Sequence, residues 1–460
     1  MAHLRPNSVA ARDAASVLHP YTNLVAHEQT GGLVIARGEG ARVYDENGRA
    51  YIESAAGLWC ASLGFSNERL VAVAAEQMRR LPYYHAFGGK SHDPMATLAE
   101  MLLERAPVPM GRVHFANSGS EANDTAIKIV WYYNNARGRP AKKKLIGRIK
   151  GYHGVTVAAA SLTGLPVNHA SFDLPLPGFF HTMTPHHYHA AEPGESEEAF
   201  ASRCADALEA LILEQGPDTV AAMWAEPIMG AGGVLVPPRG YFEKIGAVLR
   251  KYDVLLVVDE VICGFWRTGN YWGSQTFGIE PDIITCAKAL SAAYVPISAV
   301  MVRQPIYEAI ARQTDKIGTF GHGFTYSGHP VAAAVAAETL RIYDEEGIGA
   351  HVGAVGPHMQ RAIRGRFGDH PLVGEVRGVG LIGAIELVRD RESRANFDPS
   401  LKVGLRLARQ CEQHGVIGRS LPGDVLAFSP PLVISTDEID DMVDRVGQAL
   451  DALAAELAAS

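Results

Sequence analysis

The sequence predicts an α/β protein with a large domain, built on a mainly parallel sheet covered by helices, and a smaller α+β domain. The large domain is indicated by residues 70–302, where helical patterns alternate with short apolar runs, an order typical of parallel strands joined by helices. After residue 328 the pattern changes to a helix near 331–346, strands near 380–387, another helix and two apolar strands within 416–434. The apolar runs of the large domain are 113–115, 144–149, 220–225, 254–258, 283–286 and 297–302.

Both chain ends carry elements of their own. Residues 32–53 alternate apolar and polar side chains around a turn at 46–49, which predicts a hairpin packed through Val34, Val43, Tyr44, Tyr51 and Ile52. The last helix is expected to begin with Ser435 as cap and Glu438 three residues on. Its packing face is expected to contain Ile439, Met442, Val443, Val446 and Leu450.

Length and composition limit the kind of protein. A chain of 460 residues allows two or three domains, at roughly 100 to 200 residues each. Hydrophobic residues make up 47% and charged residues 20%, which favours a folded chain over a disordered one. The 42 Lys and Arg oppose 50 Asp and Glu, and a net charge of −8 gives no overall field that attracts nucleic acid or an anionic membrane. We therefore expect neither as a partner.

Cysteine usage and hydropathy bear on the compartment. The five cysteines lie far apart and form no CxxC pair, which predicts reduced thiols. Residues 1–10 lack a basic segment followed by an apolar one, and no later stretch reaches about 18 uninterrupted apolar residues. We expect a cytoplasmic protein without a membrane span.

Lys288 is the most informative single residue, because it is the only charged side chain from 283 to 302. Burying an unpaired ammonium is costly unless its pKa falls or the amine reacts. A lysine that extends from a strand end into water is the structural alternative. The functional one is a desolvated amine that attacks a carbonyl to form a Schiff base. Asp259 ends the apolar run 254–258, where sites of parallel sheets gather, and is the expected electronic partner of the amine.

The same run, ending in Asp259-Glu260, also resembles the Walker B strand of an ATPase. Such a site needs GxxxxGK[ST], and the nearest candidate, Gly89-Lys90-Ser91, has Tyr84 in place of the first glycine. No apolar strand precedes it. An ATPase is therefore a remote alternative, because the backbone cradle for the phosphates is missing.

A phosphate site is indicated by residues 115–123, which read as a short strand, a turn of small residues and the opening of a helix. Small residues let backbone N–H groups approach an anion, and a helix N-terminus adds favourable partial charge. Ser120 could add its hydroxyl. The alternative is that Ser118 or Ser120 only caps the helix.

Aromatic and imidazole rings occur in two further segments. Tyr152, in the segment 151–154, offers a flat ring for stacking on a cofactor, with an ordinary packed aromatic as the alternative. The histidines His181, His186, His187 and His189 lack the spacing of a zinc site and lie beside Pro185 in a predicted loop. A solvated or chance cluster is favoured there, and no metal is predicted.

Five motifs in a fixed order resemble class III aminotransferases that use pyridoxal phosphate. They are Ser-Gly-Ser-Glu-Ala-Asn at 118–123, Gly-Tyr-His-Gly at 151–154, Glu-Pro at 226–227, Asp-Glu-Val at 259–261 and Ala-Lys-Ala at 287–289. The resemblance covers essentially the whole chain. It is closest to amine–pyruvate (ω-) transaminases, a match sharpened by Leu58-Trp59-Cys60 and by the run 324–330.

The resemblance implies fold type I, the cofactor pyridoxal 5'-phosphate (PLP), and a small domain made from both chain ends. The implied segments are 1–58, 59–328 and 329–460. Lys288 would be the Schiff-base lysine and proton carrier, Asp259 the partner of the pyridinium nitrogen, and Glu226 an acid that orients this assembly. The remaining cofactor contacts would come from Gly119 and Ser120 on the phosphate, Tyr152 and Val261 on the two ring faces, and Thr325 on the phosphate of the neighbouring subunit. The active unit would be a homodimer with both sites at the interface, with a tetramer as the alternative.

For the substrate, the resemblance implies an amine that gives its nitrogen to pyruvate, yielding an aldehyde or ketone and L-alanine with S preference. The pocket walls would be Tyr21, Trp59, Tyr152, Ala231 and the partner's Phe87. Arg419 would pair with a substrate carboxylate and move aside for an apolar amine, since a fixed buried guanidinium would penalise that amine. A solvated loop arginine is the alternative there. An aminomutase or decarboxylase on the same fold is the alternative function, and the natural amine stays open.

One position departs from the family. Trp266 stands where the family usually has a second glycine in the loop after Asp259. The resemblance therefore does not extend to the conformation of this loop, whereas the roles it implies for Lys288 and Asp259 are unaffected.

Overall fold

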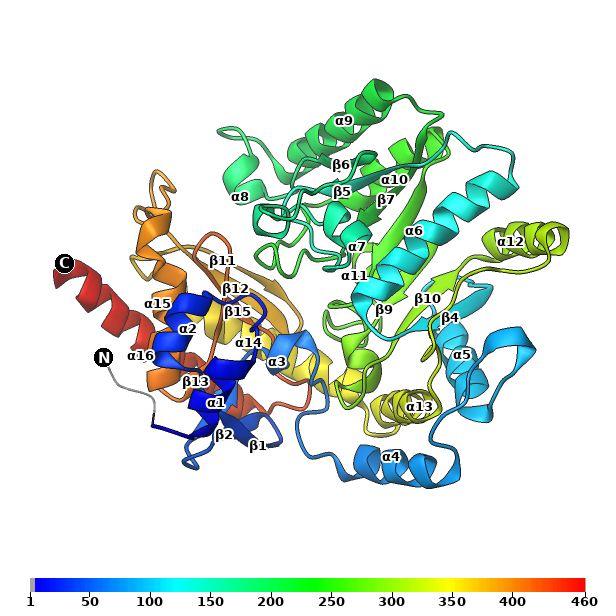
Figure 1. The fold of residues 1–460 in the computed structure, drawn as a ribbon. Coiled ribbons are helices and arrows are strands. Elements are labelled where there is room, and N and C mark those ends of the chain that lie inside the picture. Colours follow the sequence, from blue (N-terminus) through cyan, green and yellow to red (C-terminus); the bar gives the residue numbers. More distant parts are fainter. Residues whose placement is uncertain (1–4, 460) are drawn as a thin grey trace.

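The computed structural model describes residues 5–459, and shows a large sheet covered by helices with two small sheets beside it (Figure 1). Residues 1–4, part of the segment expected to lack a leader, lie outside the described residues. The large sheet has the strand order β4-β10-β9-β8-β7-β5-β6. Strand β10 pairs antiparallel with both β4 and β9, and the pairs from β9 to β6 are parallel. The strands are β4 (Arg112–Ala116), β5 (Lys144–Arg148), β6 (Phe179–Thr182), β7 (Val220–Ala225), β8 (Leu255–Asp259), β9 (Ile283–Cys286) and β10 (Ser298–Val302).

Each predicted apolar run of the large domain becomes a strand, and the α/β fold is confirmed. Strand β6 was not predicted. It is the edge strand, pairs only with β5, and has just four residues, of which His181 and Thr182 are polar. A short edge strand needs no long apolar run, so its signal is lost among the surrounding loops.

Strand β8 shows why the sheet is covered on both sides. Leu255 and Val257 pack with helix α6 (Gly119–Ala136), whereas Leu256 and Val258 pack with α9 (Glu197–Gln215) and α10 (Tyr241–Lys251). Successive strand residues point to opposite faces, so a strand that is apolar throughout is buried between two helix layers. Asp259 follows as the first polar side chain, at the carboxyl edge of the sheet.

The two chain ends meet in the smaller part (Figure 1). Strands β1 (Ile35–Glu39), β2 (Arg42–Asp45) and β3 (Ala50–Glu53) form the N-terminal sheet, and β13 (Val416–Ile417) joins β3 in parallel. The predicted turn is confirmed, because Asp45 Oδ1 accepts from the N–H groups of Asn47 and Arg49 at 2.9 Å each. The second small sheet contains β11 (Val373–Val379), β12 (Ile382–Leu387), β15 (Val425–Phe428) and β14 (Arg419–Leu421).

Helix α16 (Thr436–Ala459) packs on α14 (Ile348–Phe367) and α15 (Val403–Gln413). Its predicted cap is confirmed: the Glu438 N–H donates to Ser435 Oγ at 3.2 Å, and the Ser435 N–H donates to Glu438 Oε2 at 3.1 Å. Helix α14 was not predicted, because Pro357 and several glycines lower its helical propensity. Burial of its apolar face outweighs that preference.

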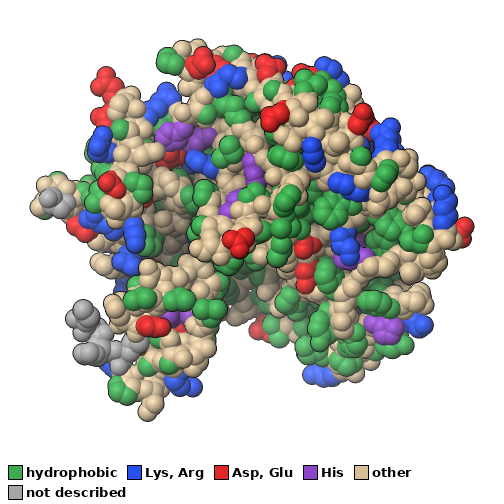
Figure 2. All heavy atoms as spheres, turned by 45° about the horizontal axis from the view of Figure 1, so that its top comes forward, with side chains coloured by type: hydrophobic (Ala, Val, Ile, Leu, Met, Phe, Trp, Pro, Cys, Tyr) green, Lys and Arg blue, Asp and Glu red, His purple; other side chains and the backbone are tan. Residues whose placement is uncertain are grey.

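The remaining helices complete the layers. They are α1 (Val9–Ser16), α2 (Leu24–Thr30), α3 (Ala56–Trp59), α4 (Glu68–Arg80), α5 (Asp93–Arg105), α7 (Val157–Leu162), α8 (His187–Ala190), α11 (Gly273–Phe277), α12 (Gln304–Ile317) and α13 (Pro330–Glu345). Acidic and basic side chains are interspersed over the face in Figure 2. Among residues 5–459, no helix has the length and apolarity that crossing a membrane requires.

Candidate active site

The predicted site residues converge on a cavity of about 440 Å³ that reaches the carboxyl end of β8. Residues from the N-terminal segment, the large sheet and strand β14 all line it, although they are up to about 400 positions apart in sequence. The predicted residues that line it are Tyr21, Trp59, Gly119, Ser120, Tyr152, Glu226, Ala231, Asp259, Val261, Lys288 and Arg419. Phe87 and Thr325, which were expected to serve the neighbouring subunit, are exposed and do not line this cavity.

Asp259 is a fixed, buried acid. It is the last residue of β8, and only 3% of it is exposed. Its Oδ2 accepts hydrogen bonds from Asn123 Nδ2 and His153 Nδ1, both at 2.9 Å, and its Oδ1 accepts from the Val261 N–H at 3.1 Å. Three donors from three segments thus hold the carboxylate in one orientation, and hydrogen bonds to an ionised acceptor are stronger than neutral ones.

Asn123 and His153 were assigned no role from the sequence, although both lie within the quoted motifs. Asn123 Nδ2 also donates to the His153 carbonyl at 2.7 Å, and its Oδ1 accepts from Trp224 Nε1 and Thr285 Oγ1 at 3.1 Å each. The amide is therefore locked by partners on both of its ends. The available signal was their position: one lies in the first turn of a helix, and the other directly follows Tyr152.

Lys288 begins the 3₁₀ turn Lys288–Ser291 and has a φ of +52°, which is strained for a residue with a side chain. Its Nζ lies 5.3 Å from the centre of the Trp59 ring. Burial lowers the pKa of Lys288, which favours the neutral, nucleophilic amine. A buried lysine was expected to have a lowered pKa, and Lys288 does.

Glu226 links two backbone segments that line the cavity. It is buried, and its Oε1 accepts from the Tyr152 N–H while its Oε2 accepts from the Gly230 N–H, both at 3.0 Å. Burial raises the pKa of Glu226. These bonds fix the backbone that carries the Tyr152 ring and the turn that leads to Ala231.

The start of helix α6 lines another part of the cavity through Gly119 and Ser120. Ser118 is the cap, since its Oγ accepts from the Glu121 N–H at 3.2 Å. A Cβ at Gly119 would lie 3.2 Å from Val261 Cγ1, so the glycine keeps this end open. Ser120 Oγ accepts from the Val155 N–H at 3.1 Å, which leaves its hydroxyl hydrogen for a ligand.

Trp59 and Arg419 form a wall that combines an aromatic ring with a cation. Arg419 Cζ lies 5.0 Å from the centre of the Trp59 ring, and Arg419 Nε is buried without a hydrogen-bond partner. Burial lowers the pKa of Arg419, although a guanidinium remains charged at neutral pH. Nearby, the hydroxyl of the largely exposed Tyr21 accepts from Asn168 Nδ2 at 2.6 Å.

Residues 24–450 match the family described as "Aminotransferase class-III". The chain belongs to this family. It is 55% identical to the ω-transaminase from Pseudomonas jessenii in complex with PMP, with a TM-score of 0.95 over 97% of this chain and 98% of that one. A structure described as "Transaminase with L-ala" is 53% identical, with a TM-score of 0.91 over 92% and 100% of the two chains. The mitochondrial gamma-aminobutyrate transaminase 1 of Oryza sativa subsp. japonica is 49% identical over 437 residues, which cover 95% of this chain and 84% of the relative.

This class III aminotransferase therefore has fold type I and catalyses transamination with PLP, of which PMP is the aminated form. The family match also rejects the ATPase alternative. The residues present fit the cofactor: an open helix start with a glycine suits its phosphate, a buried acid suits its ring nitrogen, and an amine of lowered pKa suits its carbonyl carbon.

Trp266, which stands where the resemblance implies a glycine, has a backbone conformation that favours glycine. Its φ is +73°, in the region that favours glycine. Packing offsets this strain, because the ring lies so close to Gly349 of α14 that a Cβ there would be 2.6 Å from Trp266 Cη2. The loop after Asp259 is thus braced against α14 in this chain.

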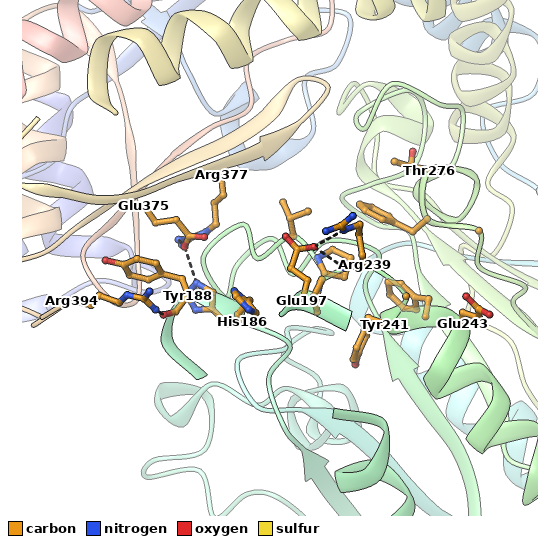
Figure 3. A pocket seen from close by; sticks show the side chains of 18 residues that line it. His186, Tyr188, Glu197, Arg239, Tyr241, Glu243, Thr276, Glu375, Arg377 and Arg394 are labelled. Carbon is orange, nitrogen blue, oxygen red and sulfur yellow. Dashed lines mark hydrogen bonds and ion pairs between the residues drawn. The ribbon is translucent and has the colours of Figure 1, made fainter. Parts of the chain in front are cut away.

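Of the two expectations for these histidines, a solvated or a chance cluster, the first is wrong. His186 is 5% exposed and its Nε2 lies 3.0 Å from Glu375 Oε2, while His189 bonds Glu386 and His187 Nε2 donates to the Glu195 carbonyl at 2.9 Å. Glu375 of β11 and Glu386 of β12, distant in sequence, contact the rings of His186 and His189. His186 and His187 line a cavity of about 890 Å³, which is larger than the first one and does not include Lys288; His186 is labelled in Figure 3.

Proposed function

We propose that this enzyme transfers the amino group of a primary amine to pyruvate, giving an aldehyde or ketone and L-alanine, with S selectivity. One observation carries the proposal: a guanidinium, Arg419, lies against the apolar Trp59 ring in the cavity that holds Lys288. A single pocket can then accept either an apolar group or a carboxylate.

The chain supplies the positions that the cofactor needs. Gly119 and Ser120 at the start of α6 would hold its phosphate, Asp259 its ring nitrogen, and Tyr152 and Val261 the two faces of its ring. When bound, the cofactor supplies an electron sink that stabilises negative charge on the substrate carbon. The hydrogen bonds from Asn123 and His153 keep the Asp259 carboxylate oriented, so that it stabilises a proton on the ring nitrogen.

Lys288 would act as acid and base. Its Nζ is close to the Trp59 ring, and burial lowers its pKa, which makes the amine a better proton donor and leaves more of it in the neutral form that accepts a proton. The surrounding side chains, among them Trp59 and Ile262, limit the access of water to this amine.

Arg419 would pair with the carboxylate of pyruvate and alanine. The buried Nε without a partner shows that the guanidinium has unused hydrogen-bonding capacity. For an apolar amine, the side chain must turn away, because a desolvated charge facing an apolar group is unfavourable. The relative described as a complex with L-ala supports alanine as a ligand of this kind of site.

A second copy of the chain would complete the site. Phe87 and Thr325 are exposed here, beside the exposed rings of Tyr83, Tyr84 and Tyr326. Tyr83 donates its hydroxyl hydrogen to the Thr325 carbonyl at 2.9 Å, so these segments form one surface. An exposed apolar surface of this kind suits burial in a homodimer, in which Phe87 and Thr325 of each copy reach the other's cavity.

The choice of donor distinguishes this proposal from the alternatives. An arylalkylamine, a diamine and γ-aminobutyrate should each be assayed with pyruvate and with 2-oxoglutarate. We expect an amine without a carboxylate to react with pyruvate. In the reverse direction, we expect the ketone to be converted to the S amine. If only γ-aminobutyrate reacts, the enzyme has the same donor as its gamma-aminobutyrate transaminase relatives. If the amine loses CO₂, the enzyme is a decarboxylase, and if it is isomerised without transfer of nitrogen, the enzyme is an aminomutase.

A further inference from the structure

Two helices of the N-terminal segment bring two imidazoles onto one carboxylate. Asp13 lies in α1, His27 lies in α2, and His19 lies in the loop between them. His19 Nε2 is 2.7 Å and His27 Nε2 is 3.1 Å from the same oxygen, Asp13 Oδ2. The two rings are themselves in contact, with centroids 4.2 Å apart. Three side chains thus present three potential ligand atoms to one point, and these atoms lie within 4.8 Å of one another.

In the described part of the chain, Asp13 has no lysine or arginine partner. Among residues 5–459, the ion-pair partners of Asp13 are these two histidines alone, and no lysine or arginine shares its carboxylate. The carboxylate is therefore not already shared with a permanent cation.

In a second cluster of possible ligands, an arginine already lies between the acids. His186, Glu375 and Glu386 also bring three ligand atoms together. There, however, Arg377 Nη1 lies 2.5 Å from Glu375 Oε2 and 2.6 Å from Glu386 Oε2, so a guanidinium already fills the space between the acids. Figure 3 shows Glu375 and Arg377 together above His186. A metal ion would have to displace that buried arginine, and no such obstacle exists at Asp13.

We propose that Asp13, His19 and His27 bind a divalent late first-row metal ion such as Zn²⁺. Imidazole nitrogen and carboxylate oxygen are ligands that such ions accept, and two histidines with one carboxylate are a recurrent set. Metal–ligand distances of about 2.0 to 2.2 Å place neighbouring ligand atoms roughly 3.3 Å apart around a tetrahedral ion. The two contacts with Asp13 Oδ2, at 2.7 and 3.1 Å, would have to open by less than about 1 Å.

The exposure of the three side chains suits a site with an open position. The His27 side chain is 9% exposed, whereas the side chains of His19 and Asp13 are each 29% exposed. Solvent can therefore reach the ion and complete its coordination. Because His19 precedes the cavity residue Tyr21 by two positions, a bound ion would fix the segment that carries Tyr21 to the active site.

The test uses the holoenzyme without a polyhistidine tag, titrated with Co²⁺ as a visible-absorbing substitute for Zn²⁺. We expect one equivalent of Co²⁺ to bind, with ligand-field bands free of sulfur-to-cobalt charge transfer, and Zn²⁺ to displace it. Asp13→Asn and His27→Gln should each weaken binding by at least the roughly 10- to 100-fold that loss of an outer-sphere partner causes. Zn²⁺ should raise the melting temperature of the wild type and not of these variants.

The matched control is His186→Gln, which removes the histidine of the arginine-filled cluster and should bind Co²⁺ as the wild type does. Cofactor absorbance and circular dichroism check that each variant is folded, and His19→Gln replaces His27→Gln should the latter fail this check. The proposal is overturned if the wild type binds no stoichiometric Co²⁺. It is equally overturned if Asp13→Asn and the folded histidine variant bind Co²⁺ unchanged, or if His186→Gln abolishes binding.

Discussion

His153 Nδ1 lies 2.9 Å from Asp259 Oδ2, and this contact ties the segment of the Tyr152 ring to the acid at the end of β8. A carboxylate can only accept here, so the imidazole donates its Nδ1 hydrogen. His153 has a fully buried side chain. The orientation of the acid thus depends on a buried ring, and His153 lines the cavity together with its neighbour Tyr152.

The first prediction concerns this acid. Asp259→Asn should leave the cofactor bound but slow the reaction with an amine donor by roughly 10² or more, because a neutral amide stabilises the ring proton less. Rapid mixing of the variant with an amine, followed through the cofactor absorbance, measures this rate. An unchanged rate would mean that Asp259 only supports the structure around Asn123 and His153.

The second prediction separates the two halves of the cycle. Arg419→Ala should lower kcat/KM for pyruvate and alanine by roughly 30- to 1,000-fold, as expected for loss of a shielded charge pair worth about 2 to 4 kcal/mol. An amine without a carboxylate offers the guanidinium nothing to pair with, so its half-reaction should change far less. Measuring the amine and pyruvate half-reactions separately decides the matter. Equal losses in both would assign Arg419 a structural role.

The third prediction tests the packing of Trp266. Gly349→Ala should destabilise the enzyme by about 1 to 3 kcal/mol, because the new methyl group would overlap the Trp266 ring. In a Trp266→Gly background the same change should stabilise by roughly 0.5 to 1 kcal/mol, since alanine is the better residue in a helix. Denaturant unfolding of the four proteins gives the coupling. Additive effects would show that the ring and α14 are independent.

The fourth prediction concerns pH. Burial raises the pKa of Glu260 from 4.5 to about 7, although Ser274 and Gly273 donate hydrogen bonds to it. In the unfolded chain this acid ionises near pH 4.5, whereas in the folded chain it keeps its proton up to about pH 7. The folded state therefore binds the extra proton between these values, and its stability falls as pH rises through this window.

Glu260→Gln should remove this part of the slope of unfolding free energy against pH between about 4.5 and 7, whatever its effect on absolute stability. Glu209→Gln is a suitable control, because the pKa of Glu209 is lowered by its bonds to Lys251 and Tyr252. An unaltered slope in Glu260→Gln would show that another group titrates in this range.

The strand positions could be predicted because the sheet is buried on both faces. Leu255 to Val258 must all be apolar when helices cover each side, and such runs are readable in a single sequence. The edge strand β6 and the Pro-containing helix α14 carry no such pattern. Their conformation depends on neighbours that are distant in sequence.

The site was predictable to a similar extent. Lys288 and Asp259 are visible as charges that end or interrupt apolar runs, and the family resemblance ordered the rest. The hydrogen bonds of Asn123 could not be read in advance, because its partners Trp224, Thr285 and Asp259 lie on three different strands. The burial of His186 depends likewise on Glu375 of β11, almost 190 residues further on. Only the tertiary fold brings such groups together.

The central claim is that nitrogen passes from an amine to pyruvate through a site that requires Lys288. It is tested most directly by incubating the purified holoenzyme with a ¹⁵N-labelled arylalkylamine and unlabelled pyruvate, and following the label by mass spectrometry. The account predicts ¹⁵N-alanine in equal amount to the ketone or aldehyde formed. It predicts none from a folded Lys288→Ala variant, which lacks both the reactive amine and the proton carrier. Label released as ammonia, or ¹⁵N-alanine formed by Lys288→Ala at the wild-type rate, would contradict it.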